Sequence, residues 1–306
     1  MNDTALLALD WGTTSARAYA LDAGGRVLGE RSAALGINEV RDGAFAAALA
    51  ALLGDWAALP VPRIACGMIG SRQGWIEVPY HACPAALDAL AGGLARTPGG
   101  ELFVVPGVVC TDAGGVPDVM RGEETQILGA LDAAEPSLLA ILPGTHSKWA
   151  RVGGGRIDAF ATWMTGELYA VLLQHSILGR LAGAPAAAGA FDGRTFARGV
   201  ARGLDEPGLS HAIFGARTLA LTGGLGPLEV GDWLSGVLIG HEIASARARF
   251  GAGGEAGARV RIIGSDALAA RYAAALAQAG IDATPGPRDA AARGLLAIAH
   301  RARLIA

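Results

Sequence analysis

The first 34 residues alternate apolar segments with short polar turns, a pattern that predicts β-strands. Three strands are expected, over residues 6–11, 16–22 and 26–34. Apolar side chains then recur at helical spacing and stop at Pro60, which predicts a helix over about 42–57. Two shorter strands follow, at 63–68 and 101–105. This order of elements predicts a mixed sheet with helices on its faces.

The same kind of pattern restarts near residue 138. Its strands are expected at 138–142, 146–151, 156–162 and 259–263. Its helices are expected over about 166–179, 190–203, 228–249, 265–279 and 288–303. Between the halves, a helix that begins acidic and becomes apolar is expected to start at Gly122. Each half therefore opens with a strand, a turn and a strand, and 306 residues are enough for two domains.

The first of these turns has the residues of a phosphate site. Asp10 ends the strand, and Gly12, Thr13 and Thr14 follow in the turn. Backbone N–H groups and threonine hydroxyls can bind phosphate oxygens, and glycine lets the backbone approach them closely. A carboxylate such as Asp10 can hold Mg²⁺ through water. The alternative is an ordinary hairpin with Asp and Thr as turn residues.

The second turn repeats this chemistry. Gly144 and Thr145 match the first turn, and Ser147 and Lys148 can reach a transferring phosphate. His146 is expected to shape the turn by hydrogen bonding, because no second ligand lies at metal spacing. A solvated strand residue is the alternative for Lys148. Two such turns on one chain predict a phosphate site closed from both sides.

Composition narrows the class of protein. Hydrophobic residues make up 52% and there are 46 glycines, so the chain is expected to be compact and rich in turns. It lacks both the roughly 18-residue apolar run of a membrane helix and the basic start of a signal peptide. A formal charge of −3 without a basic stripe argues against nucleic acid as the main partner. Cys66, Cys83 and Cys110 have no CxxC spacing, which predicts reduced thiols in the cytoplasm.

Five segments, in their order and spacing, resemble the motif series of the 2-dehydro-3-deoxygalactonokinase family, within the ASKHA superfamily of sugar kinases, Hsp70 and actin. They are Asp10-Trp11-Gly12-Thr13-Thr14, Gly67-Met68-Ile69-Gly70-Ser71, Met120-Arg121-Gly122-Glu123-Glu124-Thr125-Gln126, Pro143-Gly144-Thr145-His146-Ser147-Lys148-Trp149 and Met164-Thr165-Gly166-Glu167-Leu168. The resemblance implies an α/β, two-domain ASKHA (ribonuclease H-like, actin-like) fold with mixed sheets flanked by helices and a cleft between the domains. Residues 1–135, with a C-terminal helix over about 288–306, would bind a sugar acid, and residues 136–287 a nucleotide.

The implied reaction is phosphorylation of 2-dehydro-3-deoxy-D-galactonate at its 6-hydroxyl by ATP with Mg²⁺. Kinases of this superfamily place a carboxylate base near the start of the first connecting helix, where this chain has Glu123 and Glu124. Glu123 is preferred as the base, with Glu124 pairing Arg121 or supporting the metal. The base of the superfamily is usually Asp, which is a departure here. The alternative is that both carboxylates serve only the helix N-terminus.

A sugar acid needs a cation or several donors for its carboxylate. The loop with Ser71, Arg72, Gln73 and Trp75 is the expected place, with Arg72 as a bidentate partner and Arg121 as the second candidate. Trp75 would stack on the sugar or belong to the core. Across the cleft, Glu167 would bind substrate hydroxyls or serve only as a first-turn acid.

The resemblance also places the turn at Gly264 and Ser265 against the adenosine, with Ser265 both capping the helix and touching the ribose. Gly223 and Gly224 would line the nucleotide, or form an ordinary flexible turn. The small apolar segment 234–240 can pack within the second domain or against a second subunit, and the resemblance favours a homodimer.

Two other functions stay open at this point. One is a kinase for another keto-deoxy sugar acid, such as 2-dehydro-3-deoxygluconate, which differs at one stereocentre. The other is a non-catalytic nucleotide switch of the actin or Hsp70 kind, which would hydrolyse ATP slowly whatever acid is present.

Overall fold

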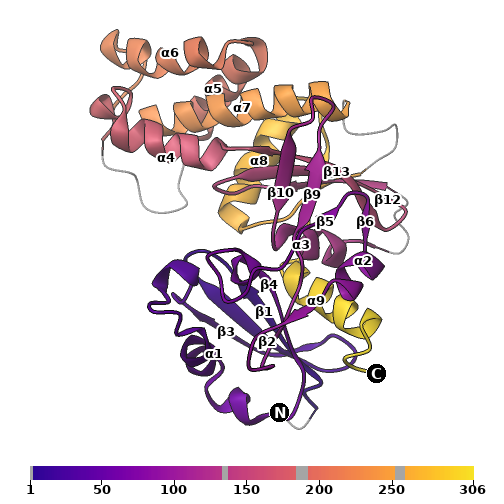
Figure 1. The fold of residues 1–306 in the computed structure, drawn as a ribbon. Coiled ribbons are helices and arrows are strands. Elements are labelled where there is room, and N and C mark those ends of the chain that lie inside the picture. The colour runs from indigo at the N-terminus through magenta and orange to yellow at the C-terminus, as the bar shows by residue number, and fades with distance from the viewer. Residues whose placement is uncertain (1–2, 133–136, 184–191, 252–258) are drawn as a thin grey trace. The chain divides into compact units, whose positions relative to one another are not determined.

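The computed structural model describes residues 3–132, 137–183, 192–251 and 259–306. Its contacts divide the chain into two units (Figure 1). The first comprises Met1–Pro136, Val152–Phe160 and Pro287–Ala306, and the second comprises Ser137–Arg151 and Ala161–Gly286. The division places residues 152–160 in the first unit, and the sugar-acid and nucleotide roles expected for the two domains stay predictions.

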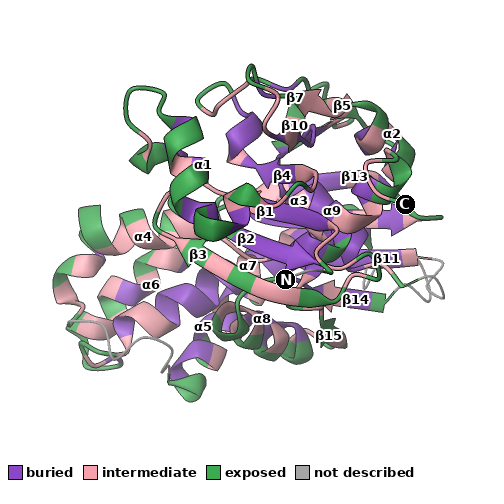
Figure 2. Cartoon of the chain, turned by 90° about the horizontal axis from the view of Figure 1, so that it is seen from below, coloured by how far each residue is buried: buried purple, intermediate pink, exposed green. Residues whose placement is uncertain are grey.

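The first unit is built on a six-stranded sheet whose strand β1 ends at the expected phosphate turn. The strand order is β3-β2-β1-β4-β8-β7, with bounds Leu6–Trp11 (β1), Ala16–Leu21 (β2), Val27–Ala33 (β3), Arg63–Gly67 (β4), Ala95–Arg96 (β7) and Phe103–Val104 (β8). β1 runs antiparallel to β2 and parallel to β4, so Asp10 lies opposite Cys66. All other β1 residues are fully buried, which explains their unbroken apolar sequence (Figure 2).

Two helices pack on this sheet and a third carries the acidic motif. Helix α1 (Phe45–Leu53) covers the face with Leu7, Leu9 and Trp11, and α9 (Ala290–Arg301) also contacts β1. Helix α3 (Glu123–Gly129) crosses α9 closely, since a Cβ at Gly294 would overlap with Thr125 O. This contact fixes α3, and with it the two glutamates, beside the end of β1.

A small sheet in the first unit was not predicted. Its order is β10-β9-β5, with bounds Pro117–Met120 (β10), Val108–Thr111 (β9) and His81–Ala82 (β5). Helix α2 (Leu87–Gly92) and β6 (Ala85–Ala86) lie in the same part of the chain, and β6 pairs with Arg156 and Ile157. Strands of two to four residues are too short to show an alternating pattern, which is why the sequence did not reveal them.

The third sheet has the order β15-β14-β11-β12-β13-β6, and its strands β11, β14 and β15 belong wholly to the second unit. The bounds are Ser137–Leu142 (β11), Ser147–Gly153 (β12), Arg156–Trp163 (β13), Arg259–Ile262 (β14) and Ala283–Pro285 (β15). β11 and β14 are parallel, so the turns that follow them are neighbours: an added Cβ at Gly264 would lie 3.6 Å from Pro143 Cδ. The second phosphate turn and the Gly264 turn therefore meet at one edge of this sheet.

Among the described residues, five α-helices belong to the second unit. They are α4 (Thr165–His175), α5 (Gly193–Asp205), α6 (Leu209–Leu221), α7 (Val230–Phe250) and α8 (Asp266–Gln278). The expected helices match α4, α5, α7 and α8, although residues 190 and 191 lie outside the described ranges. Helix α6 was not predicted; it follows Gly208 and has no side-chain cap that would mark its start.

Helices α5 and α7 touch backbone to backbone through glycine. An added Cβ would overlap with Trp233 O at Gly199, Phe196 O at Gly236 and Val200 O at Gly240. The small apolar segment 234–240 therefore packs within its own unit, as one of the two expected alternatives required, and a homodimer stays a prediction. None of the helices in the described ranges has the length and hydropathy needed to cross a membrane.

The contact between α5 and α7 predicts the effect of adding one methyl group. Gly236→Ala should lower the free energy of unfolding by about 1–3 kcal/mol, because the new Cβ meets backbone that cannot rotate away. Urea unfolding measures this change in the free energy of unfolding. Gly193→Ala is the matched control, since a Cβ there meets no atom within 4 Å. Equal stability of the two variants would contradict the close packing of these helices.

Candidate active site

In the first turn expected to bind phosphate, backbone carbonyls accept hydrogen bonds from another segment, whereas the threonine hydroxyls are exposed. Ile37 N donates to Gly12 O at 3.0 Å, and Asn38 N donates to Thr13 O at 3.1 Å. Thr13 and Thr14 are exposed. The turn is thus fixed from behind while two hydroxyls remain accessible to a phosphate.

Asp10 lies beside this turn and is only partly exposed to solvent. Gln126 Nε2 donates to Asp10 Oδ2 at 3.2 Å, and Cys66 Sγ lies 3.9 Å from Oδ1. Burial raises the pKa of Asp10 and the nearby charge of Glu123 adds to the rise, whereas the hydrogen bond from Gln126 lowers it. Gln126 was not predicted as a site residue, although it follows Glu123 by three positions on one helical face.

The two glutamates of α3 have different surroundings. Glu124 is completely buried, and its oxygens accept hydrogen bonds from Gly122 N at 2.7 Å and Thr125 Oγ1 at 2.9 Å. Burial and the charge of Glu123 raise the pKa of Glu124 to about 7. Glu123 is partly exposed, and Arg121 N donates to its Oε2 at 3.0 Å. Both carboxylates therefore bind backbone N–H groups at the helix start.

Arg121 lies inside the first unit without a counter-ion in the described ranges. Its side chain is buried, Nη2 donates to Val78 O at 2.7 Å, and the guanidinium lies 4.3 Å from the centre of the Tyr80 ring. Its Nε and Nη1 have no hydrogen-bond partner among the described residues, and neither has the buried Ser71 Oγ. Uncommitted buried donors of this kind are uncommon in folded proteins.

The other residues of the expected sugar loop point elsewhere. Arg72 is exposed and forms an ion pair with Glu77 at 3.3 Å. Gln73 is exposed too. Trp75 stacks on Phe45, with ring centroids 6.1 Å apart, and packs against the core, as its alternative assignment required.

The second phosphate turn is clamped by the start of α4. Glu167 N donates to Thr145 O at 3.0 Å, and an added Cβ at Gly166 would overlap with Gly144 O. The Glu167 carboxylate binds His146 Nε2. His146 thus contacts a neighbour of the turn, as expected for a residue that shapes it.

Residues 147 and 148 point to opposite faces of β12. Ser147 Oγ donates to Glu242 Oε1 at 2.7 Å. Lys148 is only 5% exposed, and its Nζ lies 3.3 Å from Thr162 Oγ1. The solvated alternative for Lys148 is therefore wrong, and its role in phosphate transfer stays a prediction.

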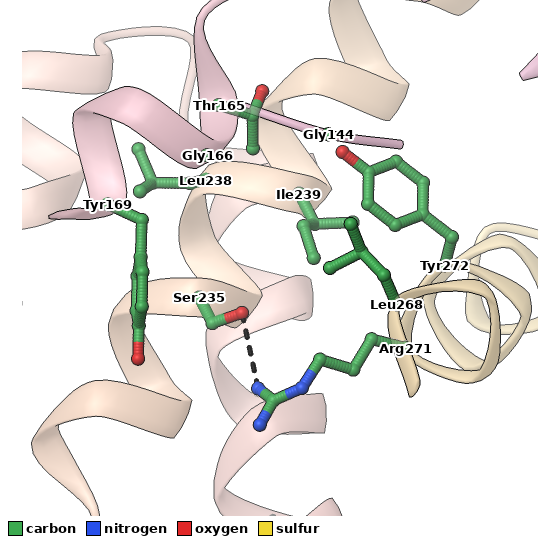
Figure 3. A pocket seen from close by; sticks show the side chains of 10 residues that line it. All are labelled: Gly144, Thr165, Gly166, Tyr169, Ser235, Leu238, Ile239, Leu268, Arg271 and Tyr272. Carbon is green, nitrogen blue, oxygen red and sulfur yellow. Dashed lines mark hydrogen bonds between the residues drawn. The ribbon is translucent and has the colours of Figure 1, made fainter. Parts of the chain in front are cut away.

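A cavity of about 230 Å³ opens beside Gly144 (Figure 3). Its walls come from the phosphate turn, α4, α7 and α8, and the lining residues are Gly144, Thr165, Gly166, Tyr169, Ser235, Leu238, Ile239, Leu268, Arg271 and Tyr272. Aromatic and aliphatic walls with a few polar groups suit the base and ribose of a nucleotide. Gly223, Gly224, Gly264 and Ser265 are not among these residues. Ser265 stands at the N-cap of α8, but its side chain makes no cap hydrogen bond, so the expected capping role is wrong.

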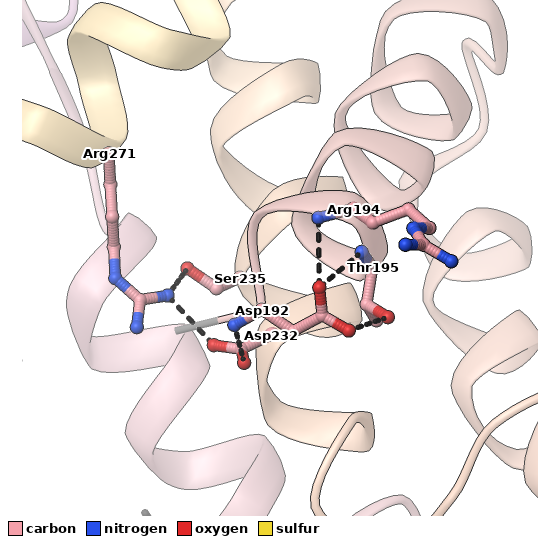
Figure 4. A network of polar contacts seen from close by, with 6 residues as sticks. All are labelled: Asp192, Arg194, Thr195, Asp232, Ser235 and Arg271. Carbon is pink, nitrogen blue, oxygen red and sulfur yellow. Dashed lines mark hydrogen bonds and ion pairs between the residues drawn. The ribbon is translucent and has the colours of Figure 1, made fainter. Parts of the chain in front are cut away.

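Arg271 is held in the cavity wall by a polar network (Figure 4). Its Nη1 lies 3.2 Å from Asp232 Oδ1 and 3.3 Å from Ser235 Oγ. Asp232 Oδ2 in turn accepts from Asp192 N at 2.8 Å. Asp192 caps α5, and the hydrogen bond from Thr195 is the main cause of its lowered pKa. The network therefore links α5, α7 and α8 at the cavity.

Sequence reasoning missed Glu242, Asp232 and Tyr169. Glu242 is 1% exposed and accepts hydrogen bonds from four side chains of the second unit. One acid that follows the small apolar segment 234–240, directly after His241, was the only signal available. Its partners are spread from residue 147 to residue 272, so no local pattern could have joined them.

Known proteins of one family match this chain over nearly its whole length. The family model of 2-keto-3-deoxy-galactonokinase matches residues 10–298. The 2-dehydro-3-deoxygalactonokinase of Escherichia coli (strain K12) is 37% identical over 295 residues, which cover 96% of this chain and 97% of that protein. A Rhizobium meliloti (strain 1021) protein named for the same activity, DgoK1, is 39% identical over 300 residues, 96% of each chain.

A solved structure from the same family has a similar fold. A Sinorhizobium meliloti protein, proposed to be a 2-dehydro-3-deoxygalactonokinase, superposes with a TM-score of 0.84 at 36% identity and covers 97% of this chain and 98% of its own. The expected fold and resemblance are thereby confirmed. The chain belongs to the 2-keto-3-deoxy-galactonokinase family and has the ASKHA fold of these kinases.

Proposed function

We propose that this chain transfers the γ-phosphoryl group of Mg-ATP to the 6-hydroxyl of 2-dehydro-3-deoxy-D-galactonate. As a member of a kinase family, it is a phosphotransferase that acts on an alcohol group. One structural observation supports the proposal: Gly144 belongs both to the turn expected to bind phosphate and to the wall of the cavity of about 230 Å³. A nucleotide in that cavity would have its phosphates at the turn.

The first phosphate turn offers a second set of donors. Thr13 and Thr14 are exposed and the turn backbone is fixed by Ile37 and Asn38, so little rearrangement is needed to bind phosphate oxygens. That both turns hold one triphosphate stays a prediction. Gly223, Gly224 and Ser265 stay weaker proposals for nucleotide contacts because the cavity wall does not include them.

Asp10 fits a hydrated magnesium ion. Its carboxylate has Gln126 as an orienting partner, and the described residues contain no group of three or more His, Cys, Asp or Glu that could enclose a metal directly. Magnesium keeps several waters and usually takes only one or two carboxylates. Such an ion would neutralise charge on the phosphates during transfer.

Glu123 is the better candidate for the general base. Both oxygens of Glu124 are already committed and the residue is completely buried. Glu123 is partly exposed, and its charge is close enough to raise the pKa of Asp10. It would accept the proton of the 6-hydroxyl as that oxygen attacks.

Arg121 replaces Arg72 as the preferred partner of the substrate carboxylate. A buried guanidinium without a counter-ion costs several kcal/mol, of the order given for uncompensated buried charges. A carboxylate bound by Arg121 and Ser71 would satisfy donors that the described residues leave unpaired. Arg72 is exposed and already paired with Glu77. Gln73, Trp75 and Glu167 stay as weaker proposals for sugar contacts.

The test is an ADP-release assay with purified protein, Mg-ATP and a panel of sugar acids. The proposal expects turnover that requires 2-dehydro-3-deoxy-D-galactonate and is much weaker with its gluconate stereoisomer. A preference for the gluconate would reassign the substrate. Slow ADP release that ignores every acid would overturn the kinase assignment and favour a nucleotide switch.

Removal of the proposed base should stop the chemical step. Glu123→Gln is expected to lower kcat by about 10²–10⁴-fold, the usual contribution of a positioned base. ADP affinity, measured by calorimetry, should stay close to that of the unchanged protein. Glu77→Gln makes the same chemical change at an exposed position and should retain activity. Undiminished kcat in Glu123→Gln would place the base elsewhere.

The two arginines can be separated by matched variants. Arg121→Met should raise the KM for the sugar acid by about 10–100-fold, as expected for the loss of hydrogen bonds to a charged group. Arg72→Met should leave this KM unchanged because Arg72 is exposed. Thermal melts check that both variants fold. The opposite order of effects would restore Arg72 as the carboxylate partner.

Glu124 predicts a pH dependence of stability. Its pKa is raised from the ordinary 4.5 to about 7 in the folded state, so the folded protein holds the proton more tightly than the unfolded chain. The resulting stabilisation is complete below the unfolded pKa and is lost as pH rises through about 7. Its size is roughly 3 kcal/mol.

Urea unfolding across this pH window, compared with Glu124→Gln, isolates the contribution of Glu124. The variant cannot titrate at residue 124, so its free energy of unfolding should fall less as pH rises. Parallel curves for the two proteins would show that Glu124 titrates normally in the folded state.

A further inference from the structure

The carboxylate of Glu242 is enclosed and fully hydrogen-bonded. Oε1 accepts from Ser147 Oγ and Trp149 Nε1, each at 2.7 Å. Oε2 accepts from Tyr272 OH at 2.7 Å and from Thr165 Oγ1. The residue is 1% exposed. Four neutral donors thus converge on one acid, and no ion pair to it occurs among the described residues.

The donors belong to the elements that form the nucleotide cavity. Ser147 follows the phosphate turn on β12, and Thr165 begins α4, which clamps that turn through Gly166 and Glu167. Tyr272 lies on α8 and lines the cavity together with Thr165. One carboxylate on α7 therefore joins the phosphate turn, the helix that clamps it and the opposite cavity wall.

We infer that Glu242 is a positioning residue for the nucleotide: it sets the Gly144–Thr145 turn and the Tyr272 wall in the geometry that binds the phosphates. The inference rests on the proposed function, since it assumes that the cavity holds a nucleotide. A buried acid without a cation is a poor way to stabilise a core, because apolar residues of similar volume do as well or better. What the Glu242 carboxylate does instead is hold four hydrogen-bond donors in a fixed arrangement.

The chemistry of the donors distinguishes two substitutions. Trp149 Nε1 can only donate, so a glutamine at this position must keep its amide oxygen at the Oε1 site. Its amide nitrogen would then face the hydroxyls of Thr165 and Tyr272, which can accept after rotation. Glu242→Gln therefore keeps every partner. Glu242→Leu removes the shared acceptor of all four donors, although Tyr272 OH can still donate to Ser147 Oγ at 3.2 Å.

The experiment measures ADP affinity by calorimetry, and the KM for ATP and for the sugar acid, in these variants. Glu242→Leu should weaken ADP binding and raise the KM for ATP by about 10–100-fold, the scale of a misplaced binding group, with the KM for the sugar acid unchanged. Glu242→Gln should restore values close to those of the unchanged protein. Ser245→Ala is the matched control on α7, since it removes the acceptor of Trp163 Nε1 without touching the turn.

The outcomes separate the possible failures. A purely structural role would lower the melting temperature and the active fraction of Glu242→Leu and leave both KM values unchanged, which overturns the inference. If Glu242→Leu does not fold, Tyr272→Phe and Thr165→Val each remove one donor and should shift ADP affinity in the same direction; unchanged affinity in both overturns it too. An unchanged protein that binds no ADP would overturn the proposed function, and the inference with it. ADP binding without sugar-acid phosphorylation would refute only the proposed substrate.

Discussion

Direct backbone contact between helices, made possible by glycine, holds in place the helices that carry the site. In the first unit, Gly294 of α9 lets α3 approach closely, and α3 brings Glu123 beside Asp10. In the second unit, Gly199 and Gly236 let α5 and α7 touch, and α7 presents the acid that gathers the cavity walls. Side chains larger than hydrogen at these contacts would separate the helices and move the functional groups they carry.

The acidic residues of the two units have different surroundings. In the first, burial and the nearby charge of Glu123 raise the pKa of both Asp10 and Glu124, an arrangement that suits a site where a cation and a proton are handled. In the second, the partners of Glu242 among the described residues are neutral donors, and burial raises its pKa although all four hydrogen bonds lower it. The acids of the first unit therefore suit a catalytic role. Glu242 suits a positioning role, in which its hydrogen bonds hold the cavity walls in place.

The sequence was most informative where local pattern and local chemistry coincide. Strands β1 and β11 lead into turns that contain Gly-Thr, and β2 follows the first of these turns, so these elements were predicted within a residue or two. The orientation of the loop with Ser71 and Arg72 was not predictable, because it depends on which side chain the rest of the unit leaves room for. The Glu242 network was hidden because its partners come from distant segments, and β5, β9 and β10 were missed because they are short.

The most direct test of this account is ³¹P NMR of the purified protein with Mg-ATP and 2-dehydro-3-deoxy-D-galactonate. The account predicts that a phosphomonoester on the 6-oxygen of the acid grows in step with ADP, while inorganic phosphate stays at its background level. Inorganic phosphate as the product, formed at the same rate with and without the acid, would contradict it.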